Sequence, residues 1–135
     1  MAYNNIAAIG TCSVNTGITI DNPVALMTID NIIHILGEIT NSSITSGTRV
    51  LTLPTSFPTM ERRTVGTCVI EHDSGTPKYE IGFFVINTAN QIYTAQAIAS
   101  TDVVHLDQLQ FSMNGKFYSS KIGNISGFTS PLNTR

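Results

Sequence analysis

Three adjacent ionisable residues, Glu71, His72 and Asp73, form the most polar cluster of the sequence. Two carboxylates and an imidazole can ligate a metal ion or hydrogen-bond the hydroxyl groups of a sugar. In an extended strand successive side chains point to opposite faces, so Glu71 and Asp73 share one face and His72 lies on the other. Because the three do not converge unaided, we expect no metal site. His72 and Asp73 are candidate saccharide contacts, and a solvated strand end is the alternative.

Tyrosines beside predicted turns are the second set of candidates. Tyr79 follows the turn-forming residues 73–77, and Tyr93 and Tyr118 lie near the ends of other predicted turns. The C–H faces of sugars stack on aromatic rings, while neighbouring amides and carboxylates hold the hydroxyl groups. We therefore predict Tyr79 and Tyr93 as saccharide contacts. Ordinary packing of these rings at the rim of a barrel is the alternative.

A pair of arginines, Arg62 and Arg63, stands out among otherwise scattered positive charges. The pair follows Met60 and Glu61 in a segment that we expect to be an exposed loop. A guanidinium pairs well with phosphate oxygens, so Arg62 is a candidate contact for the phosphate of a teichoic acid. A solvated loop, or an ion pair between subunits, is the alternative.

None of the common catalytic patterns occurs in the sequence. It contains no Gly-x-Ser-x-Gly nucleophile elbow, no phosphate-binding loop and no glycine-rich dinucleotide motif. A glycosidase needs two carboxylates that face each other across about 5–9.5 Å. The nine acidic residues, most of them near predicted turns, suggest no such pair. We therefore expect a protein that is not an enzyme and that uses no cofactor.

The composition is polar but weakly charged. Charged residues make up 12% of the 135 residues, against about 25% in an average soluble domain. Asn, Thr and Ser supply the polarity instead, which suits a surface that meets neutral partners such as sugars. The net charge of -2 argues against nucleic acid, because binding to nucleic acid requires a basic surface.

The length predicts one domain, spanning residues 1–135, that buries its own core. No run approaches the roughly 18 apolar residues of a membrane-spanning helix, and the N-terminus lacks the pattern of a signal peptide. We expect synthesis in the cytoplasm without membrane insertion. Cys12 and Cys68, the two cysteines of the chain, are then expected to remain unpaired, with Cys68 buried and Cys12 a free thiol.

The elements that must position these residues are predicted to be β-strands. Alternating apolar and polar residues predict strands at 24–29, 31–40, 50–53, 64–73, 78–87 and 91–100. Residues 30–31, 73–77 and 87–90 have the composition of the turns between them. The regular spacing of short strands predicts an all-β barrel or sandwich of about seven to nine strands.

Four details of this pattern concern burial. On one face of the strand at 31–40 the large side chains are isoleucines, namely Ile33, Ile35 and Ile39. This strongly apolar face is expected to be buried. His34 and His105 lie among apolar residues, and each is expected to be a hydrogen-bonded histidine inside the barrel or at a seam between subunits. The strand at 78–87 is apolar on both faces near its middle, which predicts burial on both. Pro54 ends the strand at 50–53 and leads into a rigid, exposed turn.

The two ends of the chain are less regular. Asn114 and Gly115 are the preferred pair for a type I′ hairpin turn. Residues 88–114 contain neither glycine nor proline; we predict strand there, with a short helix at 103–109 as the alternative. Residues 1–17 and 123–135 are expected to be loosely organised, or to be arms held by a neighbouring subunit.

The order of these segments resembles a known family. Two apolar strands at 27–40 lead through a Ser/Thr/Gly link into the run Leu51-Thr-Leu-Pro-Thr-Ser-Phe-Pro58, followed by segments at 66–71, 85–93 and 104–112. This pattern resembles the C-terminal head domain of receptor-binding proteins and tail-fibre tips of tailed bacteriophages that infect Gram-positive bacteria. The resemblance covers residues 24–112, and its sharpest element is the Leu-Pro-x-x-Phe-x-Pro turn.

The resemblance implies a Greek-key β-barrel that forms a homotrimer in the virion, at a tail tip, baseplate or capsid surface. It also implies binding of host cell-surface saccharide or teichoic acid without catalysis. Trimerisation also fits the low charge and the many Ile and Val residues. Family members often stack sugar on tryptophan, which this chain lacks, and no binding residue transfers by motif. A structural virion protein of the same fold, such as a capsid decoration or baseplate component, is the first alternative, and a bacterial β-sandwich lectin is the second.

Overall fold

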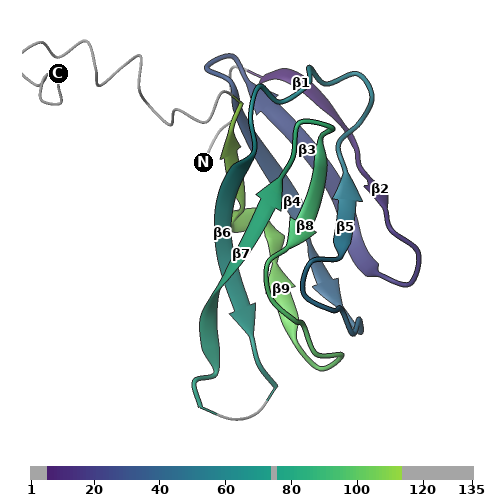
Figure 1. Ribbon diagram of the computed structural model, residues 1–135, viewed down its shortest axis with the longest axis vertical. Helices are drawn as coiled ribbons and strands as arrows, with labels where there is room; N and C mark the ends of the chain where they lie inside the picture. The colour runs from purple at the N-terminus through teal and green to yellow at the C-terminus, as the bar shows by residue number, and fades with distance from the viewer. Residues whose placement is uncertain (1–5, 74–75, 114–135) are drawn as a thin grey trace, which may run out of the picture.

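The computed structural model describes residues 6–73 and 76–113, and these are built almost entirely of β-strands and turns (Figure 1). The strands are, in chain order, β1 (Ile6–Thr11), β2 (Ser13–Val14), β3 (Thr19–Thr28), β4 (Ile32–Thr40), β5 (Arg49–Thr52), β6 (Thr64–Glu71), β7 (Tyr79–Ile86), β8 (Gln91–Thr94), β9 (Val103–His105) and β10 (Gln110–Ser112). A 3₁₀ helix, η1 (Leu106–Gln108), separates β9 from β10, and the described residues contain no α-helix. The predicted all-β class is confirmed.

The sheet curls into a nearly closed antiparallel barrel that the N-terminal segment completes. Nine strands follow one another in the order β1-β3-β4-β9-β6-β7-β8-β5-β2, and β10 pairs with β4. The strands at the two ends of this order, β1 and β2, are consecutive in the chain and meet at Cys12. Because β1 pairs with β3 and β2 pairs with β5, this one segment connects both edges of the sheet.

The prediction that residues 1–17 are loosely organised is therefore wrong for residues 6–14. Strand β1 is largely exposed and shows no regular alternation of buried and exposed apolar residues. Its place in the sheet depends on backbone pairing with β3, which an apolar pattern does not reveal.

The inward faces of the strands form one core. The predicted burial of Ile33, Ile35 and Ile39 is confirmed, since all three are fully buried on β4. Phe84 of β7 and Phe111 of β10 are the bulkiest fully buried side chains. Burial of these apolar side chains is the main stabilising contribution to the barrel.

Asparagines make the tight corners that the sequence predicts. Asn31 has a φ of 67° in the turn between β3 and β4, and Asn90 has a φ of 61° in the turn between β7 and β8. Asparagine tolerates this left-handed conformation better than other non-glycine residues. In the second turn Asn87 Oδ1 also accepts hydrogen bonds from the N–H groups of Ala89 and Gln91, each at 2.9 Å.

The proline-rich run after β5 is anchored to the core as well as exposed. Phe57 is buried between exposed neighbours, and its N–H donates to Pro54 O at 3.0 Å. The buried Asn90 secures the far side of the run, because its Oδ1 accepts from the N–H of Met60 at 2.8 Å and its Nδ2 donates to Pro58 O at 3.0 Å. The predicted rigid turn thus owes its position to one aromatic side chain and one asparagine from another corner.

The C-terminal part of the described chain departs from the predicted long strand. The strand expected at 91–100 ends at Thr94, and residues 103–109 form β9 followed by η1 rather than an α-helix. Both β9 and β10 pair with β4, at Glu38–Ile39 and Ile32–His34 respectively, but only β9 also pairs with β6. From η1 onward the chain therefore no longer pairs with β6, although it continues to pair with β4. The predicted hairpin at Asn114 and Gly115, Tyr118 and residues 123–135 lie outside the described residues.

The three predictions about burial have different outcomes. The middle of β7 buries only its inward residues, Gly82, Phe84 and Ile86, whereas Phe83 is 46% exposed. No described strand covers the outward face of β7, so its apolar residues remain at the surface. His105 is hydrogen-bonded as predicted, but it lies half-exposed on the outside of the barrel rather than inside it, where two carboxylates contact it; its place at a seam between subunits stays a prediction. His34 is buried as predicted.

Candidate functional site

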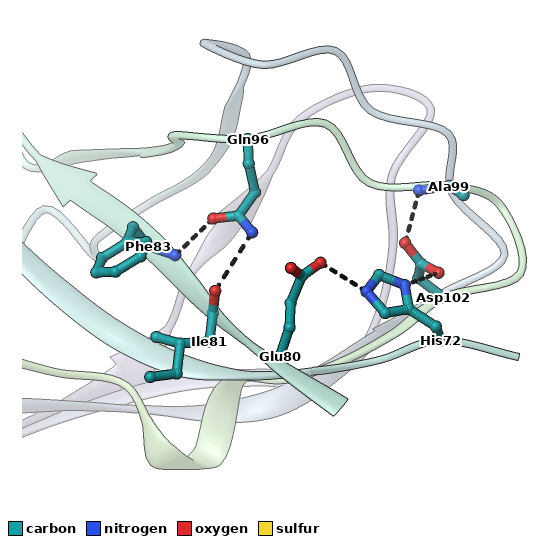
Figure 2. Close-up of polar contacts among 7 residues, drawn as sticks. All are labelled: His72, Glu80, Ile81, Phe83, Gln96, Ala99 and Asp102. Atoms are coloured by element: carbon teal, nitrogen blue, oxygen red, sulfur yellow. Dashed lines mark hydrogen bonds and ion pairs between the residues drawn. The ribbon is translucent and has the colours of Figure 1, made fainter. Parts of the chain in front are cut away.

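His72 joins three segments at one end of the barrel (Figure 2). It follows the last residue of β6, and its Nε2 lies 2.6 Å from Glu80 Oε1 on β7. Its Nδ1 lies 2.9 Å from Oδ1 of Asp102, in the loop that precedes β9. The buried Asp102 also accepts a hydrogen bond from the N–H of Ala99 through Oδ2, at 2.9 Å. We call His72, Glu80 and Asp102 the His72 cluster.

The geometry of the His72 cluster favours the charged imidazole. Hydrogen bonds to Asp102 and then to Glu80 raise the pKa of His72 above its ordinary value, against a smaller opposing effect of burial. When both ring nitrogens carry a proton, each donates to a carboxylate. Neither nitrogen then has a lone pair to ligate a metal or to accept a proton from a substrate. The His72 cluster is therefore arranged to connect β6, β7 and the loop before β9.

Gln96 extends the same connection along the edge of β7. Strand β8 ends at Thr94, and beyond it the side-chain Oε1 of Gln96 accepts from the N–H of Phe83 at 2.9 Å while its Nε2 donates to Ile81 O at 3.4 Å (Figure 2). The amide of Gln96 thereby takes the place of a strand residue beside β7. Together with the His72 cluster it holds residues 95–102 against the β6–β7 hairpin.

A second histidine lies between carboxylates on the outer surface. His105 Nε2 is 3.0 Å from Glu71 Oε1, and its Nδ1 is 3.5 Å from Glu38 Oε2. These residues come from β9, β6 and β4, which are adjacent in the sheet. Glu71 and His72 thus belong to separate clusters, which confirms the prediction that strand alternation keeps them apart.

The structure brings only some of the five predicted contacts together. His72, the exposed Asp73 and Tyr79, which is 57% exposed at the start of β7, lie at the hairpin end of β6 and β7. Tyr93 is half-buried on β8, and its hydroxyl donates to Gln91 Oε1 at 3.2 Å. Arg62 precedes the other end of β6, roughly 30 Å from His72 at the usual rise per strand residue. Sequence reasoning missed Asp102 and Glu80, which carry no local motif.

Two grooves lie at the two ends of β6. The hairpin-end groove, about 390 Å³ in volume, is lined by Thr40, Asn41, Asp73, Ser100, Thr101, Asp102 and Val103. The β6–β10 groove, about 370 Å³ in volume, is lined by Thr64, Val65, Gly66, Thr67, Gln108, Gln110 and Ser112. The first contains two carboxylates, whereas every residue lining the second is neutral.

The outward face of the β6–β7 hairpin is apolar. Register pairs Val65 with Val85, Thr67 with Phe83 and Val69 with Ile81, all on one side of the two strands. We call this surface the β6–β7 outer face. Ile81 is 59% exposed and Phe83 is 46% exposed. An exposed apolar surface of several hundred Å² commonly marks a contact with another molecule.

Two kinds of feature are absent from residues 6–73 and 76–113. No group of three or more His, Cys, Asp or Glu side chains there is placed to hold a metal ion. Within these ranges no helix has the length and apolar character needed to cross a membrane. Both thiols are buried, and burial raises the pKa of Cys12 and of Cys68 to about 12, so neither is a reactive nucleophile at neutral pH.

Comparison with known proteins identifies a structural likeness. No protein-family model matches the sequence, and no curated protein matches it. The fold is similar to the crystal structure of the receptor binding protein (gp15) of Listeria phage PSA, with a TM-score of 0.58 and 13% sequence identity. The match covers 77% of this chain and 63% of that one, so this chain spans less than two thirds of its length. At this identity the likeness shows the fold alone, which is a phage receptor-binding-like barrel.

Proposed function

We propose that this chain is a virion protein of bacteriophage adsorption that binds host cell-wall saccharide without changing it chemically. The observation that carries the proposal is the similarity of the barrel to a phage receptor binding protein. The weakly charged composition supports it, because neutral amides and hydroxyls are the groups that hydrogen-bond sugar hydroxyls. The place of such a protein is the outside of the virion.

The arrangement of reactive groups supports a role without catalysis. Both ring nitrogens of His72 face carboxylates within 2.9 Å, so the ring is occupied in a structural contact. A general base needs a free nitrogen within hydrogen-bond reach of the proton that it removes. The buried thiols of Cys12 and Cys68 offer no alternative nucleophile.

Of the predicted contacts at the hairpin end, Asp73 and Tyr79 are exposed. Asp73 lines the hairpin-end groove, and Tyr79, at the start of β7, presents a ring on which a sugar face can stack. Tyr93 and Arg62 lie away from the hairpin end. They either contact a different unit of a long polymer or take no part in binding. His72 acts by holding the end of the hairpin in place.

Self-association of the chain, as a homotrimer, is the second part of the proposal. On the β7 side of the β6–β7 outer face, Ile81 and Phe83 are exposed, and no charged residue stands between Ile81 and Val85 on that strand. Such a surface fits a neutral surface on a neighbouring copy better than it fits a charged partner. Three linked sites would also raise a weak affinity for a repeating polymer.

The test of recognition is a binding titration with host wall material. Purified wall polysaccharide, poly(glycerol phosphate) and a panel of neutral oligosaccharides are titrated into the protein by calorimetry. Saturable binding to at least one member is expected, with no release of reducing sugar. Silence across all of them would remove the proposed recognition function.

The test of self-association is the mass in solution. One chain has a mass of 14.6 kDa, and the wild type is expected to scatter light as three copies. Phe83→Ser together with Ile81→Ser should shift the mass to that of one chain, while Thr88→Ser, in the exposed β7–β8 turn, should leave it unchanged. A wild-type mass of one chain at micromolar concentration contradicts the trimer.

A structural virion role is the second candidate, and the β6–β7 outer face is the observation that favours it. In a capsid decoration or baseplate component this apolar surface would bind another virion protein. The two functions separate cleanly in the binding titration. A structural component binds no member of the panel but still binds its neighbouring virion protein.

A further inference from the structure

We propose that the β6–β10 groove is a binding site for a neutral saccharide unit. This inference deepens the proposed recognition function and depends on it. It assigns the site to residues that sequence patterns do not single out, and it chooses a neutral sugar over the phosphate of a teichoic acid.

The groove lies where strand pairing along β6 ends. Strand β9 pairs with β6 at Val69, Ile70 and Glu71, and after η1 the chain continues as β10, which lies close to β6 at Gly66 without pairing with it. The β6 edge from Thr64 to Cys68 consequently has no paired strand on that side among the described residues. The opening between β6 and β10 is therefore a consequence of the topology.

Gly66 shapes the floor of the groove. A Cβ atom at this position would lie 2.6 Å from Gln110 O and 2.9 Å from Leu109 Cδ1. Only a glycine permits the backbones of β6 and β10 to approach this closely. The side chains on either side of it, Val65 and Thr67, are exposed and stand on the groove's β6 wall.

Three polar side chains of the groove have no hydrogen-bond partner among the described residues. In the ranges that the structure describes, the side chains of Thr67, Gln108 and Gln110 make no hydrogen bond to another residue. Two amides and one hydroxyl present both donors and acceptors, and a sugar hydroxyl needs both. The groove's volume of about 370 Å³ lies within the usual range of about 300–1,000 Å³ for small-ligand sites.

The absence of charge among the lining residues selects the ligand. A phosphate is bound most strongly by Arg, Lys or a set of backbone N–H groups, and no charged residue lines this groove. Neutral amides discriminate through the number and direction of hydroxyl groups instead. A neutral sugar with one apolar face against Val65 satisfies these groups better than an anion does.

The experiment measures the affinity of matched variants for the neutral oligosaccharide that the wild type binds in the panel. Thr67→Val keeps the shape and removes one hydroxyl, and Gln110→Ala removes one amide. Each is expected to weaken binding by about five- to tenfold, the usual effect of one lost hydrogen bond. Thr59→Val, which alters an exposed threonine outside the groove, should leave the affinity unchanged. Thermal unfolding of each variant checks that the fold is retained.

A charge variant decides between the two ligand chemistries. Gln110→Lys is expected to weaken binding of the neutral oligosaccharide and to leave poly(glycerol phosphate) without measurable affinity. If the lysine instead tightens binding of a wild-type anionic ligand, the neutral assignment is overturned. If the groove variants weaken self-association and not saccharide binding, the groove is a protein contact and the proposal is also overturned.

Failure of the groove and failure of the recognition function give different results. If the wild type binds sugar and only Asp73→Ala or Tyr79→Ala reduces the affinity, the site is the hairpin-end groove; the groove assignment is overturned and the recognition function remains. If the wild type binds no member of the panel, both are overturned.

Discussion

The two ends of β6 use polar residues in opposite ways. At the hairpin end His72 meets Glu80 and Asp102, while Glu71 meets His105, so the ionisable groups are paired with one another. At the other end Thr67 presents a hydroxyl that hydrogen-bonds to no described residue, beside neutral amides from η1 and β10. At the more highly charged end the polar groups therefore connect segments of the chain to one another.

This difference shows which polar residues to regard as candidates for binding. A charged group that is partly removed from water needs a partner, and within the fold the nearest opposite charge supplies one. A neutral amide at the surface has no such requirement and remains available to a ligand. The density of ionisable residues, which first draws attention to Glu71, His72 and Asp73, is a weaker guide than the absence of an internal partner.

The largest expected effect comes from filling the floor of the β6–β10 groove. Gly66→Ala places a Cβ 2.6 Å from the backbone oxygen of Gln110, which cannot move without displacing β10. We expect a loss of about 3 kcal/mol in the free energy of unfolding, at the upper end of overpacking effects. Urea denaturation measures it.

Gly82→Ala on the neighbouring strand is the matched control. There the new Cβ meets the side chain of Ile70, which can change rotamer, and the expected loss is about 1 kcal/mol. Equal losses for the two variants would show that the contact between β6 and β10 is not a rigid part of the barrel.

The next effect concerns the hairpin end of β6, where the ionisable groups are paired with one another. Asp102→Ala removes the buried carboxylate that accepts from Ala99 N–H and contacts His72. A buried donor left without an acceptor costs about 1–3 kcal/mol, so we expect about 2 kcal/mol of destabilisation by urea denaturation. Asp107→Ala, at an exposed position in η1, should change stability by less than about 0.5 kcal/mol. A similar loss in both variants would contradict the structural role of the His72 cluster.

The dependence of stability on pH should show a maximum near the ordinary histidine pKa of about 6.5. The pKa of His72 is raised, chiefly by Asp102, so the folded state keeps a proton that the unfolded state loses, and stability falls as pH rises above that value. The pKa of His34 is lowered by burial, against an opposing effect of Asp30. Below the ordinary value the unfolded state takes up a proton that folded His34 does not, so stability also falls as pH decreases.

Urea denaturation of the wild type and of His72→Gln across pH 5 to 9 tests this assignment. The variant should lose the decline on the alkaline side and keep the decline on the acidic side. An unchanged alkaline limb would mean that His72 is not the group responsible. The paired end of β6 would then contribute no pH dependence of its own.

The sequence predicts local corners well, because each depends on one or two residues. Asn31 and Asn90 adopt the positive φ expected of asparagine in tight turns, and the isoleucines of β4 are buried as their alternation predicts. The closure of the barrel by β1 and β2 was not predicted, because it depends on backbone pairing between an exposed segment and β3 and β5.

The candidate sites are harder to predict for a related reason. His72 and Asp102 are 30 residues apart in the chain, and the β6–β10 groove combines β6 with η1 and β10. No local spacing connects such residues, and neutral Thr and Gln side chains belong to no catalytic or metal-binding motif. The sequence indicates that His72 takes part in a polar cluster, but not that its partners lie within the chain.

The smallest expected effect concerns Arg62, the one predicted contact near the neutral end of β6. The side chain is exposed, as is that of the adjacent Arg63, and a guanidinium there would detect an anionic ligand. If the groove binds a neutral sugar, Arg62→Gln should change the affinity less than twofold, and the affinity should not vary between about 0.05 and 0.5 M salt, because screening acts on charged pairs. Calorimetry at the two salt concentrations measures both quantities. A large loss in the variant, accompanied by weaker binding of the wild type at high salt, would show that charge contributes to recognition at both ends of the strand and would remove the contrast between them.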